Sequence, residues 1–473
     1  MENGRKNLLI MAFFLFFLGS CSNAKVDNQD IEEPEFKEVS VHDPSIIKTN
    51  NEYYIIGSHL GFAKSDDLIQ WEQLSENVSN NTLFKDVKLE LAESFDYANT
   101  DTLWASDIIQ LSDGKFYLYY CFCEGSSPLS TLGVAVADDI EGPYEDLGVF
   151  LKSGSDDLNG EPYDATTEPN VIDPHVFYDN DGKLWMVYGS YSGGIFILEM
   201  DEKTALPIEN QGYGKKLLGG NHSRIEAPYI LYNKDTEYYY LFLSYGGLDS
   251  YGGYNIRVSR SKNPNGPYYD SEGHDMLNAM GEDGTYFDDV AIEKYGAKLM
   301  GNFQFHKEDE LIKEGYVSPG HNSAYYDEEK NTYFILFHTR FPTFDEYHEV
   351  RVHQLFFNDL EWPVIAPLRY AGETISSYSP REISGEYSMI NHGKDITSEI
   401  KHPFSIQLNK NGTIEGDLGG TWLVDEHNNA KITVDDVVYT GVFILQWDDY
   451  NKQNTMAFTA MSEDGVTIFG IQE

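Results

Sequence analysis

The sequence predicts an all-β protein in which a five-bladed β-propeller is followed by a small C-terminal β domain. Aromatic residues make up 14% of the 473 residues, including 34 Tyr and 27 Phe, and this richness favours strands over disorder. A strand–turn–strand pattern recurs five times along the chain. The pattern changes after about Tyr378, which predicts a separate domain over residues 379–473.

The N-terminus predicts a lipoprotein signal peptide over residues 1–20. Arg5 and Lys6 precede an apolar run, Leu8 to Gly19, that is too short to span a bilayer. The run ends in Leu18-Gly19-Ser20-Cys21, which resembles the lipobox of bacterial lipoproteins. That resemblance implies acylation of Cys21, so that lipid attaches the chain to a membrane without the chain crossing it. The alternative is a plain secretory signal with a chance Cys.

Residues 21–36 are polar and acidic, which predicts a flexible tether between lipid and domain. Ser22 after the lipidated Cys resembles lipoproteins sorted to the outer membrane of Gram-negative cells, and the membrane face is left open. The two remaining cysteines, Cys121 and Cys123, lie in an apolar segment and are expected to be buried thiols, with no metal spacing and no disulfide framework.

The five repeats each have the plan of a β-hairpin. A short strand leads into a turn of residues that tolerate positive φ, and an aromatic strand follows. The paired segments are 43–47 with 53–56, 105–109 with 116–120, 173–177 with 184–188, 226–230 with 238–242, and 321–325 with 333–337. Their first positions are 62, 68, 53 and 95 residues apart, which leaves room for two more strands per repeat. Repeated four-stranded units predict a five-bladed propeller over residues 37–378, and an irregular β-sandwich is the alternative.

The C-terminal segment has its own pattern of turns and apolar runs. A turn at Asn411-Gly412 is followed by apolar runs at 421–424, 430–434, 442–445 and 456–460. This pattern predicts a small barrel or sandwich. The segment contains no recognisable set of catalytic residues.

In a propeller, equivalent positions of all blades converge on one central channel. The first positions of the five repeats are Asp43, Ala105, Asp173, Glu226 and His321. Three carboxylates and an imidazole therefore meet at one end of the axis, although packing like charges together costs folding energy. Two carboxyl groups, one protonated and one ionised, are what glycoside hydrolysis requires. A divalent-cation site and simple Asp-Pro turn starts are the alternatives.

Composition excludes some partners. The chain has 33 Lys and Arg against 78 Asp and Glu, a formal net charge of −45. Such a charge repels a phosphate backbone and a polyanionic substrate, so nucleic acid is not expected as a partner.

Five ordered motifs carry a resemblance to a known family. They are His42-Asp43-Pro44-Ser45, Trp104-Ala105-Ser106-Asp107, Asn170-Val171-Ile172-Asp173-Pro174, Arg224-Ile225-Glu226-Ala227-Pro228-Tyr229 and Ser318-Pro319-Gly320-His321-Asn322. Together they resemble glycoside hydrolase family 43, and within it the two-domain endo-α-1,5-L-arabinanases. The resemblance covers about residues 37–375, and the tail is similar to the small C-terminal β domain of those enzymes.

The resemblance implies roles for the central acids. Asp43 would be the general base that activates water, Glu226 the general acid, and Asp173 the residue that tunes and orients the acid. The family inverts configuration, which predicts carboxyl groups of Asp43 and Glu226 about 6.5 to 9.5 Å apart. His321 would help to hold one metal ion, commonly calcium, largely through bridging waters. A hydrogen-bonded channel histidine without metal is the alternative.

Sugar binding is expected from residues around the same channel. An aromatic face suits the apolar side of a furanose, so Trp104 is a candidate stacking residue, with a core role as its alternative. The resemblance implies further sugar-binding positions at Gly125, Asn170, Ser190, Tyr191 and Ser192.

These features predict a monomeric, lipid-anchored enzyme that cuts internal α-1,5 bonds of arabinan, a neutral plant polysaccharide. An exo-acting arabinofuranosidase or β-xylosidase on the same scaffold is the rival enzyme. A non-catalytic glycan-binding lipoprotein is the rival from another class, and it predicts loss of a central acid, whereas all three acids are present.

Overall fold

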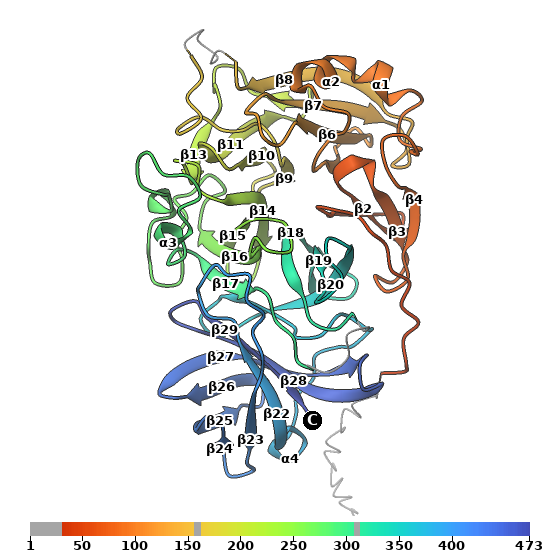
Figure 1. Cartoon of the computed structure of the whole chain (residues 1–473). Helices are drawn as coiled ribbons and strands as arrows, with labels where there is room; N and C mark the ends of the chain where they lie inside the picture. Colours follow the sequence, from red (N-terminus) through yellow and green to blue (C-terminus); the bar gives the residue numbers. More distant parts are fainter. Residues whose placement is uncertain (1–30, 156–161, 307–312) are drawn as a thin grey trace, which may run out of the picture. The chain divides into compact units, whose positions relative to one another are not determined.

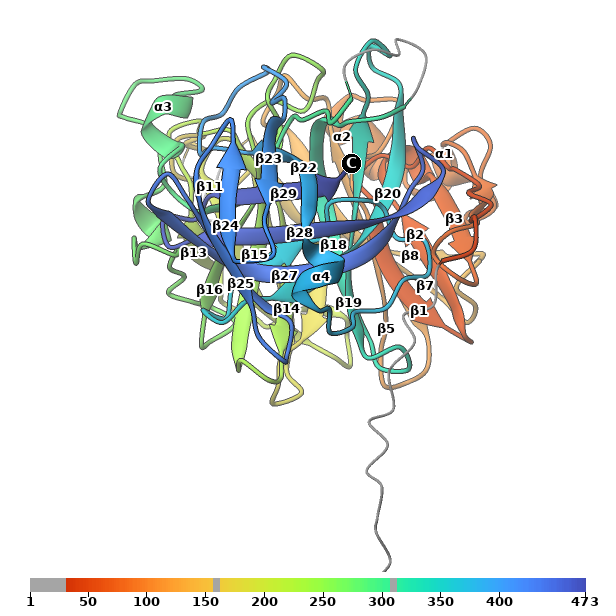
Figure 2. The same cartoon turned by 90° about the horizontal axis from the view of Figure 1, so that it is seen from below.

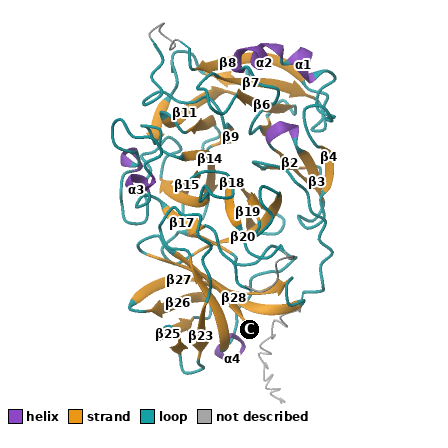
Figure 3. Ribbon diagram, viewed as in Figure 1, coloured by secondary structure: helices purple, strands orange, loops and turns teal. Residues whose placement is uncertain are grey.

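The structure is a computed structural model and describes residues 31–155, 162–306 and 313–473. Strands form most of its regular structure and the helices are short (Figure 3), which confirms the all-β prediction. The predicted signal peptide and the predicted lipidation site at Cys21 lie outside the described residues. Within the described residues, no helix has the length and apolarity that a membrane span requires.

Five antiparallel sheets form the blades of a propeller (Figure 1), as predicted. The first blade contains β1 (Ser45–Thr49), β2 (Glu52–Ile56), β3 (Phe62–Ser65) and β4 (Glu72–Ser75). The second contains β5 (Asp107–Gln110), β6 (Phe116–Cys123), β7 (Ser130–Ala137) and β8 (Glu145–Ser153). The third contains β9 (His175–Tyr178), β10 (Leu184–Ser190), β11 (Gly194–Asp201), β12 (Leu206–Pro207) and β13 (Lys215–Leu218).

The last two blades complete the ring. The fourth contains β14 (Ile225–Asn233), β15 (Tyr238–Tyr245), β16 (Asn255–Ser261) and β17 (Ala297–Met300). The fifth contains β18 (Val317–Asp327), β19 (Thr332–Arg340), β20 (His348–Phe357) and β21 (Pro363–Ile365). In every blade the predicted hairpin forms the two innermost strands, with the opening strand nearest the axis.

Aromatic second strands fill the space between blades. All eight residues of β6 are buried, and the free thiols of Cys121 and Cys123 are among them, as expected. One core cluster joins Tyr119 of the second blade to Tyr188 and Phe196 of the third. Alternate faces of each sheet thus pack on the two neighbouring blades, which is how a ring of sheets buries apolar surface without a single central core.

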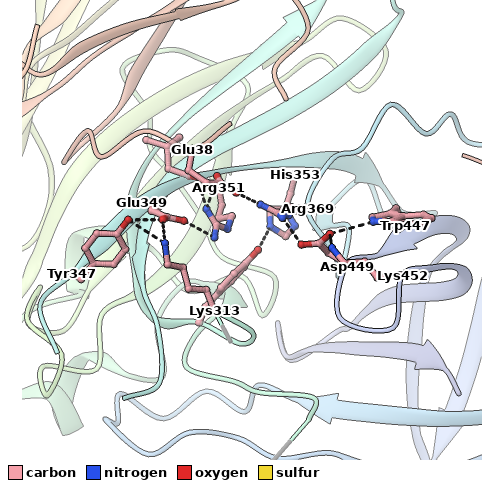
Figure 4. A network of polar contacts seen from close by, with 12 residues as sticks. Glu38, Lys313, Tyr347, Glu349, Arg351, His353, Arg369, Trp447, Asp449 and Lys452 are labelled. Carbon is pink, nitrogen blue, oxygen red and sulfur yellow. Dashed lines mark hydrogen bonds and ion pairs between the residues drawn. The ribbon is translucent and has the colours of Figure 1, made fainter. Parts of the chain in front are cut away.

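The ring closes without a shared strand, because every sheet is built from consecutive strands. The seam between the first and fifth blades is held by the segment just before β1. The amide of Val350 donates to the carbonyl of Val39 at 3.1 Å, and Glu38 pairs with Arg351 and Arg369 (Figure 4). Apolar side chains from both blades, such as Ile55 and Leu336, pack in one cluster across the seam.

The C-terminal domain is a closed eight-stranded barrel, which decides between the predicted barrel and sandwich. Its strands are β22 (Gly385–Asn391), β23 (Phe404–Leu408), β24 (Thr413–Gly416), β25 (Gly420–Val424), β26 (Asn429–Val434), β27 (Val437–Asp448), β28 (Gln453–Ser462) and β29 (Thr467–Gln472). The last strand pairs with the first, so that no sheet edge is left open. Figure 2 views this barrel in front of the propeller.

Polar contacts join propeller and barrel. The side chain of Gln446 on β27 donates to Glu373 at 2.8 Å and to the carbonyl of Leu368 at 2.9 Å. Lys298 on β17 is buried and donates to the carbonyls of His392 and Asp395. Figure 4 shows a further ion pair between Arg369 and Asp449.

Short helices lie in the connections. They are α1 (Val87–Glu90), α2 (Ala92–Ala98), α3 (Asp289–Ile292), α4 (Pro380–Ile383) and the 3₁₀ turns η1 (Ser58–Leu60) and η2 (Met276–Asn278). The long connection between β16 and β17 contains η2 and α3, and it reaches the functional cleft described next.

Candidate functional site

A cleft of about 490 Å³ lies at one end of the propeller axis. All ten residues that the sequence predicts for catalysis, metal holding and sugar binding line it, although they come from all five blades. They are Asp43, Trp104, Gly125, Asn170, Asp173, Ser190, Tyr191, Ser192, Glu226 and His321. Their roles stay predictions, whereas their convergence is a property of the fold.

Unusual backbone conformations mark the inner-strand positions that carry functional side chains. Asp43, Asp173 and His321 have φ angles of 59°, 55° and 46°, and Ala227, next to Glu226, has 57°. Non-glycine residues rarely adopt such angles, and they persist where surrounding structure enforces them. Ala105, the equivalent residue of the second blade, has no positive φ. Positive φ at or next to this position is therefore found in the four blades that place an acid or His321 in the cleft, and not in the second blade.

Asp43 is buried and surrounded by imidazole groups. Its carboxylate pairs with His321 at 2.9 Å and with His42 at 2.8 Å, and it accepts a hydrogen bond from the hydroxyl of Ser58. Burial by itself would raise the pKa of Asp43, but the charges of His321 and His42 outweigh it and hold the pKa well below 3.8. Asp43 is therefore ionised at neutral pH, as a general base must be.

Asp173 and Glu226 are neighbouring buried carboxyls whose pKa values are both raised. Burial, with the charges of Glu226 and Asp43, raises the pKa of Asp173 to about 8. Burial also raises the pKa of Glu226, although His321 and two hydroxyl donors oppose the shift. The donors are Ser190 at 2.8 Å and Tyr254 at 2.9 Å. The two neighbouring carboxyls thus retain a proton near neutral pH, since both cannot ionise cheaply in one buried site.

His321 lies among the three acids. Burial lowers its pKa, but Asp43, Asp173 and Glu226 together overcome this effect and raise it to about 9. Beneath the cleft, His321 and Asn322 line a void of about 20 Å³, room for about one water-sized species. Both side-chain polar atoms of Asn322 are buried and have no hydrogen-bond partner among the described residues. A single imidazole beside oxygen donors fits a hard cation held largely by water.

The predicted sugar-binding residues are held by local hydrogen bonds. The indole of Trp104 donates to the carbonyl of Cys123, and Gly125 has a φ of 89° that favours glycine in this loop. The hydroxyl of Tyr191 donates to the carbonyl of Gly246 at 2.7 Å. Ser190 differs from the rest because its hydroxyl is engaged by Glu226, so it supports the acid as well as lining the cleft.

Several functional neighbours were not predicted from the sequence. Tyr254, from just before β16, donates to Glu226, and Ser58 donates to Asp43. The backbone amide of Asp43 donates to Nδ1 of His338 at 3.2 Å, and the His338 ring stacks on His42 at 3.9 Å. Nothing in the local sequence pattern assigned Tyr254 or Ser58 a contact with the acids.

The cleft also has a rim that sequence patterns did not predict. His222, Leu248, Tyr286 and Phe287 line it on the side of the fourth blade. Tyr286 and Phe287 belong to the insertion between β16 and β17, which has no counterpart in the repeat pattern. No repeat or motif signal was available to find them.

An ionised carboxylate beside a carboxyl pair that retains a proton, at the axis of a five-bladed propeller, defines a glycoside hydrolase site. Comparison with known proteins gives the family. Residues 36–289 match the family model described as "Glycosyl hydrolases family 43", and residues 367–470 match the "C-terminal lipocalin-like domain" that accompanies it. The chain belongs to glycoside hydrolase family 43.

Individual relatives cover nearly the whole chain. "Extracellular endo-alpha-(1->5)-L-arabinanase 2" of Bacillus subtilis is 60% identical over 93% of this chain and 94% of its own length. The crystal structure of an endo-1,5-α-L-arabinanase from Thermotoga petrophila has a TM-score of 0.89 at 50% identity, over 93% of this chain and 100% of that one. A family 43 glycoside hydrolase from Bacillus licheniformis gives a TM-score of 0.90 at 57% identity, covering 93% and 99%.

Proposed function

We propose that this protein is an inverting endo-α-1,5-L-arabinanase that hydrolyses internal bonds of arabinan. The observation that carries the proposal is the convergence, in one cleft, of Asp43, which His321 and His42 hold ionised, with the neighbouring carboxyls of Asp173 and Glu226, whose pKa values burial raises. The names of the Bacillus subtilis and Thermotoga petrophila relatives support arabinan as the substrate and endo action as the mode. Arabinan is neutral, which suits a chain with a formal charge of −45.

The proposed reaction is a single displacement. The carboxylate of Asp43 takes a proton from water while the water oxygen bonds to the anomeric carbon. The glycosidic C–O bond breaks, and the proton of Glu226 passes to the leaving oxygen. Asp173 accepts a hydrogen bond from the amide of Ala227, the residue after Glu226, at 3.2 Å. This contact and the shared proton support Asp173 as the residue that orients and tunes the acid.

A calcium ion near His321 is part of the proposal. When bound, it would supply positive charge at the acidic centre, with His321 and waters as its holders. A ligand that binds only the folded state raises its stability. Calcium is therefore expected to raise the melting temperature of metal-free wild type and not that of His321→Ala. Equal responses of the two proteins would remove His321 from the metal site.

The proposed location is a membrane surface, by a lipid on Cys21. The curated relatives from Bacillus subtilis and Thermotoga petrophila are named extracellular, which supports export. Cys21→Ser is expected to move the enzyme from the membrane fraction to the soluble fraction and to abolish labelling by a fatty-acid analogue. Membrane association that survives the substitution would contradict the anchor. Separation of inner and outer membranes of a Gram-negative host then tests the outer-membrane assignment.

Product analysis tests the activity itself. Wild type acting on debranched linear arabinan is expected to release a ladder of arabino-oligosaccharides, and Glu226→Gln is expected to release none. Arabinose as the sole early product would place the enzyme in the exo class. No product from either protein, with equal binding of arabinan by both, would make the chain a glycan-binding protein.

A further inference from the structure

The rim of the cleft on the fourth blade carries two exposed aromatic rings. Tyr286 is 72% exposed and Phe287 is 52% exposed, and both line the cleft. Large exposed aromatic side chains on a soluble protein often mark a surface that binds something. Their place beside the carboxyl groups makes the polysaccharide chain the natural occupant.

The ring of Tyr286 is held in place before any ligand binds and offers a flat face. Its ring stacks on the imidazole of His222, with centroids 4.3 Å apart and planes 14° from parallel. One face is thus backed by His222, while most of the side chain remains open to solvent. Because the ring is already supported, binding a sugar against it costs little side-chain entropy.

Phe287 fixes the neighbouring position. Its ring packs edge-on against Tyr191 at 5.7 Å, and the guanidinium of Arg224 lies 5.6 Å from its centre. Arg224 is itself held by Asp289 of α3. The backbone amide of Phe287 donates to the carbonyl of His222 at 3.3 Å, which ties the two aromatic neighbours together.

The insertion is anchored to the segment that leads into the general acid. Asn221 donates to the carbonyl of Gly281 at 2.9 Å, and Ser223 accepts from the amide of Gly281 at 2.7 Å. Residues 221–224 run directly into β14, which carries Glu226. The aromatic rim and the acid therefore both lie on the fourth-blade side of the cleft, and hydrogen bonds join the segments that carry them.

The position of the general acid shows which part of the substrate lies on the fourth-blade side of the cleft. In the proposed displacement the acid protonates the leaving oxygen, so the sugar units beside the acid are the leaving part of the chain. We propose that Tyr286, backed by His222 and flanked by Phe287, is the stacking platform for arabinofuranosyl units on the leaving-group, reducing-end side of the scissile bond. This inference rests on the proposed function and goes further by assigning a side and a residue.

The test compares wild type, Tyr286→Ala and Tyr286→Phe on reducing-end-labelled linear arabino-oligosaccharides of increasing length. Tyr286→Ala is expected to lower kcat/KM on long oligosaccharides about three- to tenfold, the worth of one aromatic contact, while Tyr286→Phe keeps wild-type values. The difference is expected to vanish for substrates too short to reach the platform. Labelled fragments are expected to become shorter with Tyr286→Ala, because binding modes with fewer leaving-side units then compete better.

Tyr269→Ala is the matched control, since Tyr269 is also exposed and lies in the same blade region but does not line the cleft. Equal kcat/KM for Tyr286→Ala and wild type at every chain length would overturn the proposal. Labelled fragments that keep their lengths despite weaker activity would overturn the leaving-side assignment. A wild type that does not cut arabinan at all would instead refute the proposed function, so the two failures are distinguishable.

Discussion

The carboxyl group of Glu226 is subject to opposing influences. Burial favours its protonated form, whereas the hydroxyls of Tyr254 and Ser190 donate to it and favour the ionised form. A general acid must keep its proton in the free enzyme and lose it during reaction. The two donors therefore stabilise the product of proton transfer, at the cost of a lower starting pKa.

Removing one donor tests this balance. Tyr254→Phe is expected to raise the pKa of Glu226, so that the alkaline limb of the kcat/KM profile moves to higher pH. One hydrogen bond is worth about 0.5–1.5 kcal/mol, which corresponds to a shift of about 0.4–1 pH unit. Because Glu226 and Asp173 share protons, the measured limb belongs to the pair.

Tyr245→Phe is the control for that profile. Tyr245 is buried on β15 of the same blade, and its hydroxyl has no partner among the described residues. Its removal is expected to leave the pH profile unchanged. An unchanged alkaline limb in Tyr254→Phe as well would show that this hydroxyl does not tune the acid.

The proposed roles of Glu226 and Asp43 can be separated by the leaving group. An aryl glycoside of arabinotriose expels a phenolate that needs little protonation. Glu226→Gln is therefore expected to retain far more activity on this substrate than on arabinan, while Asp43→Asn loses activity on both. The measurement is kcat/KM for each variant on each substrate, and equal losses for Glu226→Gln on the two substrates would contradict its role as acid.

At this scale, the sequence was informative where function follows repeat position. Asp43, Asp173, Glu226 and His321 could be found because each stands at the first position of a sequence repeat. Tyr254 and His338 could not, because they come from outside the opening strands and meet the acids only in the folded ring. Contacts between residues far apart in sequence leave no local pattern.

Among the elements, the inner strands combine regular pairing with local distortion. The register of β14 shifts between Glu226 and Tyr229, and that of β18 shifts on both sides of Gly320. Such irregularities re-aim side chains next to functional sites. The positive φ values at Asp43, Asp173, Ala227 and His321 are a further local distortion of these segments. Ala105, the equivalent residue of the second blade, has no positive φ.

A pair of substitutions compares the strained and unstrained blades. Both Ala227 and Ala105 are buried, but only Ala227 has a positive φ. Glycine relieves strain at Ala227 and not at Ala105, so Ala105→Gly is expected to destabilise the protein by about 1 kcal/mol more than Ala227→Gly. Melting temperatures of the two variants measure the difference, and equal losses would show that the fourth blade stores no such strain.

The strands themselves were predictable because hairpins are local. Asn50 and Asn51 adopt φ angles of 52° and 66°, as a tight turn between β1 and β2 requires, and both residue types tolerate this conformation. The insertion between β16 and β17 was visible only as extra length. Its residues lack a repeat partner, and its path is fixed by tertiary contacts to residues 221–224.

At the scale of the whole molecule, propeller and barrel share a buried acid. Glu373 is 3% exposed, accepts from Gln446 of β27, and burial raises its pKa from 4.5 to about 7 despite that donor and the amide of Ala371. The folded protein thus binds a proton between pH 4.5 and 7 that the unfolded chain releases. The contribution of Glu373 to stability is present below pH 4.5 and is lost as the pH rises towards 7.

Glu373→Gln is expected to remove this dependence. The stability of the variant relative to wild type should increase from pH 4.5 to 7, by up to about 3 kcal/mol. The amide changes hydrogen bonding by an amount that does not depend on pH, so the slope is the readout. Melting temperatures across this range give the slope, and parallel curves for the two proteins would show that Glu373 does not titrate on unfolding.

The change of pattern in the sequence predicted a β fold after the propeller, but it did not predict whether that fold is a barrel or a sandwich. Whether eight strands make a barrel or a sandwich depends on pairing between β22 and β29, which are separated by nearly the whole domain. Short strands with alternating residues suit both architectures. The pairing of the last strand with the first, which closes the sheet, is what distinguishes a barrel from a sandwich.

The seam of the propeller has a mechanical consequence. The described chain begins at Ile31, which exchanges two 2.9 Å hydrogen bonds with Asn454 of β28, and it then passes through Glu38 and Val39 at the junction of the first and fifth blades. A force that pulls on the chain from its N-terminal side would act first on the two hydrogen bonds between Ile31 and Asn454. It would act next on the contacts of Glu38 and Val39 that close the ring. Tension applied along the chain from that side would thus be borne by bonds outside the cleft until the Ile31–Asn454 hydrogen bonds break.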